Sequence, residues 1–212
     1  MNRLIKEDYS CIGVIANHCD NTKLCVAENQ ADEFDLSELY CDFWIDINAI
    51  WDEIDAYQLA VIECEENPDC TTPPTEPINY DLKRKLIFGG DYNICNGKTR
   101  KQGGVKKVLT YYSYARYVIL NNINDTPTGL VQKINDFSIP TDLKVIKDNS
   151  DMYRNFGFKT YSDTIGFLCA NKSVFTDFQS DKCKGCGCGS DECGGTKAKG
   201  FGIRTSNIDK RI

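Results

Sequence analysis

The chain has 212 residues with 41% hydrophobic content, which is enough apolar material for a folded core and too much for general disorder. Its longest apolar runs, such as 118–120 and 165–169, fall far below the roughly 20 residues that a membrane-spanning helix needs, so we expect no membrane partner. Acids stand beside the bases at the N-terminus without an apolar signal core, which predicts synthesis in the cytoplasm.

The net charge of −6 conceals a division along the chain. Residues 1–80 hold 18 acids and 3 bases, whereas residues 81–212 hold 13 acids and 22 bases, which gives net charges of −15 and +9. This asymmetry is typical of a macromolecular partner or a self-assembling surface, and equally of two solvated faces. The acidic first half argues against wrapping nucleic acid with the whole molecule, while the second half could still face DNA.

The first 57 residues divide into a lead-in and a long helix. Turn-forming residues are frequent in 1–30, where we expect an arm or irregular lead-in. Over 32–57, Asp35 and Glu38 resemble a capping box, and the acids lie off the apolar stripe. The apolar residues recur at steps of three and four, which predicts a long amphipathic helix: Leu36, Tyr40, Phe43, Ile47, Ile50 and Ile54.

Prolines and glycines interrupt the middle of the chain. The prolines of 67–74 predict a loop, and a short helix follows near 80–87. Glycine pairs then flank a polar segment over 89–104. Its lysines and Arg100 suggest a phosphate cradle, yet the pattern Gly-x4-Gly-Lys is missing. We therefore expect a loop that is ordered mainly in an assembly, where Lys98, Arg100 and Lys101 meet protein or DNA.

Two further helices complete a mainly α fold. The spacing predicts a helix over 105–122, with Val105, Val108, Leu109, Tyr112, Ala115 and Ile119 on one stripe. Turn residues at 125–129 separate it from a helical region over 141–171, with two internal glycines as points of interruption. We expect the three long helices to pack into one core. The tail over 196–212 is basic and poor in apolar residues, which predicts a docking arm.

Four thiols lie within 11 residues in the pattern Cys183-x-x-Cys186-x-Cys188-x4-Cys193. Four thiolates satisfy tetrahedral zinc, and the intervening glycines permit the tight turns that such a chelate needs. Paired CxxC knuckles would be a stronger signal, so a disulfide or free-thiol tail stays open, as does iron–sulfur or redox chemistry. A closed four-thiolate site leaves no position for a substrate, so any zinc here is predicted to be structural.

The usual signatures of catalysis are lacking in the sequence. The chain has one histidine, no Gly-x-Ser-x-Gly element and no local Cys–His signature. The carboxylates of Glu63, Glu65 and Glu66 are adjacent, which fits a solvated charge run better than an acid–base pair. We therefore predict that the protein is not an enzyme, with no catalytic and no cofactor-binding residue.

Three segments carry a resemblance to a known family: Gly104-Val-Lys-Lys-Val-Leu-Thr-Tyr-Tyr-Ser-Tyr-Ala-Arg-Tyr117, Asp125-Thr-Pro-Thr-Gly-Leu-Val-Gln-Lys133 and Tyr153-Arg-Asn-Phe-Gly-Phe158. Their order and spacing resemble head-to-tail connector proteins of tailed bacteriophages, in particular the ring proteins of crAss-like phages. In such connectors a helical bundle is followed by a turn with a Thr-x-Gly-x-Val-like element, here Thr126 to Val131, and by a helix that carries a C-terminal arm. The resemblance covers roughly residues 31–175.

The resemblance implies a homo-oligomeric ring, commonly twelvefold, at the head–tail junction of the virion. Its partners would be copies of itself, the portal protein and adjacent ring or tail proteins, and DNA would pass through the lumen without sequence specificity. Head-to-tail association places two different faces of one chain against each other. The acidic and basic halves could supply those faces.

On this interpretation the chain divides into a lead-in at 1–30, a helical connector domain at 31–175, a cysteine-rich segment at 176–195 and a docking arm at 196–212. The alternative is a zinc-stabilised regulatory or nucleic-acid-binding module with the four thiols as its knuckle. Its phosphate contacts would come from the basic tail: Lys197, Lys199, Arg204, Lys210 and Arg211. A large ring supports the connector, whereas a monomer with salt-sensitive DNA affinity supports the module.

Overall fold

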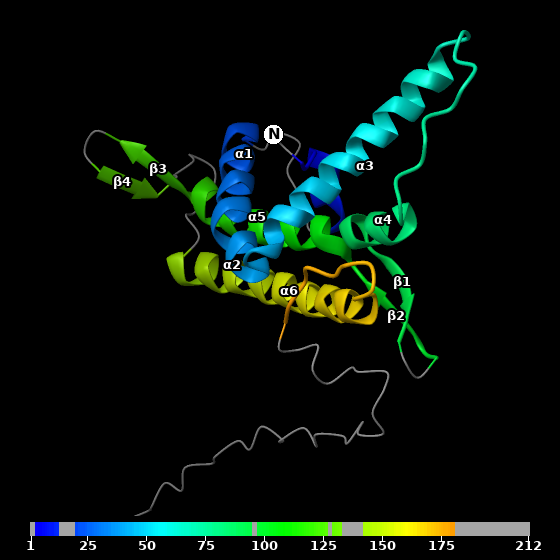
Figure 1. Ribbon diagram of the computed structural model, residues 1–212. Helices are drawn as coiled ribbons and strands as arrows, with labels where there is room; N and C mark the ends of the chain where they lie inside the picture. The colour runs from blue at the N-terminus through cyan, green and yellow to red at the C-terminus, as the bar shows by residue number, and fades with distance from the viewer. Residues whose placement is uncertain (1–2, 13–19, 95–96, 127–128, 133–141, 181–212) are drawn as a thin grey trace, which may run out of the picture.

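A computed structural model describes residues 3–12, 20–94, 97–126, 129–132 and 142–180. The fold is mainly α, as the sequence predicts, and Figure 1 shows the arrangement of its elements. In chain order these are the 3-10 helix η1 (Lys6–Cys11), α1 (Asn21–Gln30), the π-helix η2 (Ala31–Leu36), α2 (Ser37–Tyr40), α3 (Phe43–Glu66), α4 (Tyr80–Phe88), β1 (Gly90–Asn93), β2 (Thr99–Gln102), α5 (Gly104–Asn122), β3 (Ile123–Thr126), β4 (Gly129–Gln132) and α6 (Leu143–Ala170).

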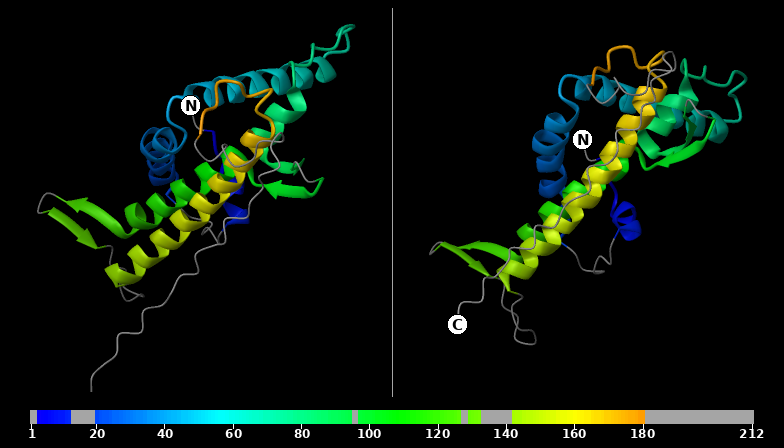
Figure 2. Two further views of the ribbon diagram at one scale, coloured as in Figure 1. Left: turned by 60° about the horizontal axis from the view of Figure 1, so that its bottom comes forward. Right: turned by 90° about the horizontal axis from the view of Figure 1, so that it is seen from below.

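The centre of the molecule is the antiparallel pair of α5 and α6, which lie side by side in every view (Figures 1 and 2). Both helices are predicted from their apolar spacing, and both are confirmed. Neither internal glycine interrupts α6. Gly157 is buried where α6 meets α5, and a β-carbon there would lie 2.7 Å from the Tyr112 ring. The glycine therefore lets the two helices approach closely.

The first 30 residues contribute to the core, which differs from the irregular lead-in that we expected. η1 and α1 pack on α5. Tyr9 and Leu24 are 2% and 6% exposed, and Ala27 is fully buried. The helix α1 begins after Asp20, whose side chain accepts hydrogen bonds from the backbone N–H groups of Thr22 and Lys23. Such a cap satisfies donors that a helix start leaves unpaired.

The helix expected over 32–57 is split in two. The chain runs from α1 through η2 into α2, then breaks at Cys41, which adopts a positive φ of 51°, before α3 begins. The predicted apolar stripe is buried across the break, because Cys41 and its neighbour lie off that stripe. Asp35 is not a cap. It lies inside η2, where it is 9% exposed and contacts Arg116.

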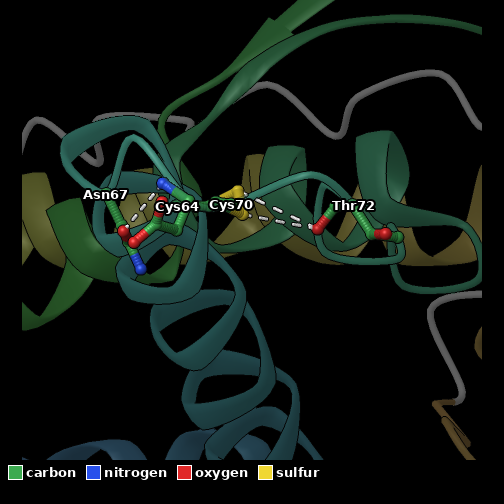
Figure 3. Close-up of a disulfide and its surroundings, with 5 residues drawn as sticks. Cys64, Asn67, Cys70 and Thr72 are labelled. Atoms are coloured by element: carbon green, nitrogen blue, oxygen red, sulfur yellow. Dashed lines mark hydrogen bonds between the residues drawn. A yellow bond between two sulfur atoms is a disulfide. The ribbon is translucent and has the colours of Figure 1, made fainter.

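The second half of α3 extends away from the body, and the following loop returns to α4 (Figure 1). The loop predicted over 67–74 is confirmed. Cys64 and Cys70 form a disulfide that ties the loop to the end of α3, with the Thr72 carbonyl oxygen 3.9 and 3.5 Å from their sulfur atoms (Figure 3). At the base of this projection, the rings of Tyr57 and Tyr80 meet with centroids 4.9 Å apart.

The segment over 89–104, expected to be a mobile loop, is a β-hairpin within the single chain. β1 and β2 pair antiparallel from Gly90 opposite Gln102 to Asn93 opposite Thr99. Gly89 and Gly104 have φ values of +87° and +80° and cross in close backbone contact at its base. A β-carbon on Gly104 would lie 2.4 Å from the nitrogen of Gly89, so the glycines serve this crossing.

A second hairpin, β3–β4, connects α5 to the segment before α6. Ile123 pairs with Gln132 and Thr126 with Gly129, so the predicted turn over 125–129 lies at the end of this hairpin. None of the described helices is both long and apolar enough to cross a membrane. The docking arm predicted over 196–212 lies outside the described residues.

Candidate functional site

A basic cleft of about 380 Å³ opens where the β1–β2 hairpin meets α5 and α6. Three lysines, Lys101, Lys107 and Lys159, line it against one acid, Asp163, and all four side chains are exposed. The complete lining is Lys101, Gln102, Gly103, Lys107, Tyr111, Phe156, Lys159, Thr160 and Asp163. Because three positive charges converge on one hollow, the cleft is suited to an anionic partner.

Gln102 fixes the hairpin at the edge of this basic cleft. Its side chain is 2% exposed and forms hydrogen bonds with three elements. The amide nitrogen donates to the Lys85 carbonyl of α4, and the amide oxygen accepts from the Gly104 N–H and, at 3.4 Å, from the Thr164 hydroxyl of α6. The neighbouring Lys101 is therefore held on a braced strand rather than on a free loop.

Two aromatic rings form the apolar part of the basic cleft. Tyr111 of α5 and Phe156 of α6 have centroids 5.9 Å apart, and Phe156 is 46% exposed. The Lys107 ammonium lies 6.0 Å from the Tyr111 ring centroid, at the outer limit of a cation–π contact. Burial raises the pKa of Tyr111, with a further contribution from Tyr153, so the phenol stays neutral at physiological pH. The cleft thus combines positive charge with exposed ring surface.

The projecting half of α3 and its return loop form an acidic tip, which we define as residues 55–79. The tip holds no lysine or arginine and contains Asp55, Glu63, Glu65, Glu66, Asp69 and Glu76. The side of α3 that carries Tyr57, Val61 and Cys64 is partly buried. The opposite side is exposed. The tip therefore presents one free helix face.

That free face is both acidic and apolar. Leu59 and Ile62 are 57% and 51% exposed, and Glu63 and Glu66 follow them at helical spacings of three and four. Residues so spaced share one side of a helix. Exposed aliphatic side chains among acids on a projecting helix are unusual for a purely solvated surface and typical of a contact surface.

Part of the charge division is used inside the chain. Lys83 contacts Glu53 at 2.6 Å, and Lys106 contacts Asp8 at 2.8 Å. Arg116 of α5 contacts Asp35 at 2.6 Å, and Arg154 of α6 reaches the same carboxylate at 3.5 Å. Each pair joins an acid of the first 80 residues to a base beyond them. The acidic tip and the basic cleft lie outside these pairs.

The comparisons with known proteins place this chain in a family. Residues 78–187 match the model of a family of unknown function (DUF6712). The chain belongs to this family. No curated protein and no solved structure matches it. The family region includes α4, both hairpins, α5 and α6, so the basic cleft lies within it and most of the acidic tip precedes it.

The predicted metal ligands, Cys183, Cys186, Cys188 and Cys193, lie outside the described residues, as do the basic residues of the tail. Within the described part of the chain, no group of three or more His, Cys, Asp or Glu side chains could hold a metal ion. The structural zinc and the choice between metal and disulfide remain predictions. Glu63, Glu65 and Glu66 are exposed on the acidic tip, in agreement with a solvated charge run.

Sequence reasoning found part of the cleft. It identified Lys101 with Lys98 and Arg100 as contact residues, and all three lie on or beside the hairpin. It missed Lys159 and Phe156, which lie 58 and 55 positions beyond Lys101. The available signal was an exposed Phe beside a Lys three positions later on a strongly periodic helix. Only the antiparallel packing of α5 and α6 brings these residues to the hairpin.

Proposed function

We propose that this protein is a structural subunit that assembles head to tail with copies of itself. The observation that carries the proposal is the separation of charge into an acidic tip on α3 and a basic cleft between the β1–β2 hairpin, α5 and α6. Figure 1 supports it, because the end of α3 points away from the pair of α5 and α6. Two different surfaces on one chain are what a heterologous contact requires.

The assembly that we propose is the connector ring at the head–tail junction of a virion. This form rests on the resemblance of the segments in α5, the β3–β4 turn and α6 to head-to-tail connectors. On this proposal the ring lies between the portal protein and adjacent ring or tail proteins, and DNA passes through its lumen. The subunit interface is then electrostatic at its edge and apolar at its centre.

Measuring the mass of the purified full-length protein against concentration tests the proposal. We expect oligomers of defined size in mass photometry and closed rings in negative-stain electron micrographs. Raising the salt concentration should shift the distribution toward monomers, because charge attraction between exposed groups is screened. A protein that stays monomeric at every concentration and at low salt would refute self-assembly.

A second candidate function is nucleic-acid binding by the basic cleft, which belongs to the alternative of a zinc-stabilised or nucleic-acid-binding module. The specific observation in its favour is the combination of three lysines with Tyr111 and Phe156, since bases stack on aromatic rings while lysines meet phosphate. Fluorescence anisotropy with a labelled single-stranded oligonucleotide tests it. We expect this candidate to bind with an affinity that falls steeply with salt.

A further inference from the structure

We infer that the acidic tip of one copy docks its free helix face into the basic cleft of the next copy. This inference rests on the proposed head-to-tail assembly and names the interface within it. The occupant is a second copy of this chain, presenting Leu59, Ile62, Glu63 and Glu66 from α3. The receiving surface presents Lys101, Lys107 and Lys159 around Tyr111 and Phe156.

The two surfaces match in chemistry. The tip carries acids and no base, whereas the cleft has three lysines against one carboxylate. Both also carry exposed apolar groups: Leu59 and Ile62 on the tip, and Phe156 at 46% exposure in the cleft. A helix that lies across the cleft can lower residues spaced by three and four into it, which is a recurrent mode of helix recognition. Apolar contact then forms the centre and ion pairs form the rim.

The apolar surface of the receiving side continues beyond the cleft. Val145 and Met152 on α6 are 49% and 38% exposed, and they precede Phe156 by eleven and four positions. These intervals bring all three residues to the same side of the helix. A docked helix would therefore meet a stripe of exposed apolar side chains along α6 and lysines at its end.

The tip is held in shape before it meets a partner. Its base is joined to α4 by the Tyr57–Tyr80 ring contact and by the nearby Lys83–Glu53 pair, and its end is closed by the Cys64–Cys70 disulfide. A surface that is already ordered loses little conformational entropy on binding. The end of α3 points away from the pair of α5 and α6 in the views of Figures 1 and 2, so we assign its occupancy to a neighbouring copy.

Charge reversal in the full-length protein tests the pairing. The tip variant carries Glu63→Lys and Glu66→Lys, and the cleft variant carries Lys107→Glu and Lys159→Glu. Each variant alone should lose oligomers in mass photometry, with an association constant reduced by more than about tenfold, because like charges then face each other. An equimolar mixture of the two variants should recover oligomers, since each tip then meets a cleft of opposite charge. A chain with all four changes should assemble by itself.

Matched controls separate this pairing from a general effect of net charge. Lys144→Glu with Lys147→Glu makes the same change in charge as the cleft variant on exposed positions of α6 outside the cleft. Asp148→Lys with Asp151→Lys matches the tip variant in the same way. Both controls should assemble as the unchanged protein does. Circular dichroism should give the same helical signal for all variants, since every altered side chain is exposed.

The outcomes distinguish this inference from the proposed function. If the unchanged protein never assembles, both are wrong. If it assembles and the reversed variants assemble equally well, self-assembly stands and this interface is overturned. Loss in both variants without recovery in the mixture or in the fourfold variant also overturns the pairing. If the cleft variant loses only salt-sensitive binding to an oligonucleotide, the cleft belongs to nucleic acid and the inference fails.

Discussion

Individual residues in this protein carry out tasks that their sequence context does not reveal. Glu28 is 5% exposed and its carboxylate accepts hydrogen bonds from the backbone N–H groups of Arg3 and Leu4. The Arg3 side chain lies over the Trp51 ring, 4.7 Å from its centroid, and contacts Asp52 at 3.1 Å. Burial raises the pKa of Glu28 in spite of the two backbone hydrogen bonds. A single arginine near the N-terminus therefore anchors the start of the chain on α1 and α3.

Asp32 gives a pH-dependent prediction. Burial raises its pKa above the ordinary value of 3.8, although Arg3 opposes the shift. The folded state then binds a proton more tightly than the unfolded state, so this group destabilises the fold as pH rises through that range. We expect the free energy of unfolding of Asp32→Asn, relative to the unchanged protein, to increase from about pH 4 toward pH 7. Urea denaturation at a series of pH values measures it, and a constant difference would contradict this.

Gly104 gives a prediction on backbone geometry. Gly104→Ala should lower the free energy of unfolding by about 2–4 kcal/mol, because a positive φ disfavours a side chain and the new β-carbon meets the backbone of Gly89 and Ile87. Gly97→Ala is the matched control. Gly97 also has a positive φ, but no atom lies within 4 Å of the added carbon, so about 1–2 kcal/mol is expected. Equal losses in urea denaturation would show that the crossing is not tight.

At the scale of elements, the molecule separates a packed centre from projecting parts. α5 and α6 form the centre with buried side chains from α1, α3 and α4. The acidic tip contributes none of the fully buried side chains beyond α3 residue Ile54. Segments with few buried contacts open locally at a lower free-energy cost than the core does. The disulfide at the end of α3 therefore stabilises the part of the chain that needs it most.

Removing that disulfide should loosen the tip and leave the centre intact. For Cys70→Ser we expect faster proteolytic cleavage within 67–79 and a loss of at most about 2 kcal/mol in overall stability, as for a short closed loop. Helical content should change little. Cys41→Ser, at an exposed free cysteine, is the control and should leave the cleavage rate unchanged. Mass spectrometry of limited digests locates the cuts, and equal rates in both variants would contradict the stabilising role.

At the scale of the whole molecule, ion pairs join the acidic first part to the basic second part. Asp35 is the most buried acid among them, with Arg116 and Arg154 as partners from two different helices. Arg116 also contacts Gln30 at 3.5 Å and lies over the Phe34 ring. The site connects η2 to both central helices. It therefore orients the first part of the chain on the part that matches the family.

Asp35→Ala should destabilise the fold by about 2–3 kcal/mol, because it leaves the partly buried Arg116 without its carboxylate. The control is Asp52→Ala, which removes an exposed partner of Arg3 and should cost less than about 1 kcal/mol. Thermal and urea unfolding followed by circular dichroism measure both. Similar losses in the two variants would mean that the Asp35 pair contributes no more than a surface ion pair.

The apolar spacing in the sequence determined the helical class, the extent of α5 and α6, and the buried side of α3, because burial at steps of three and four is a local pattern. It could not determine the break at Cys41 or the helix over residues 21–30. The break falls between two members of the stripe, so it leaves the spacing unchanged. The helix has little amphipathic spacing and is stabilised by packing on α5.

Charge shows the same limit. The sequence determined that acids gather before residue 81 and bases after it. Only the tertiary structure decided which of them pair inside the chain and which remain exposed on the acidic tip and in the basic cleft. The cleft needs Lys101 from a hairpin, Lys107 from α5 and Lys159 from α6, three positions that the chain brings together only when its two central helices pack antiparallel. Such contacts depend on distance in space, which local sequence patterns do not encode.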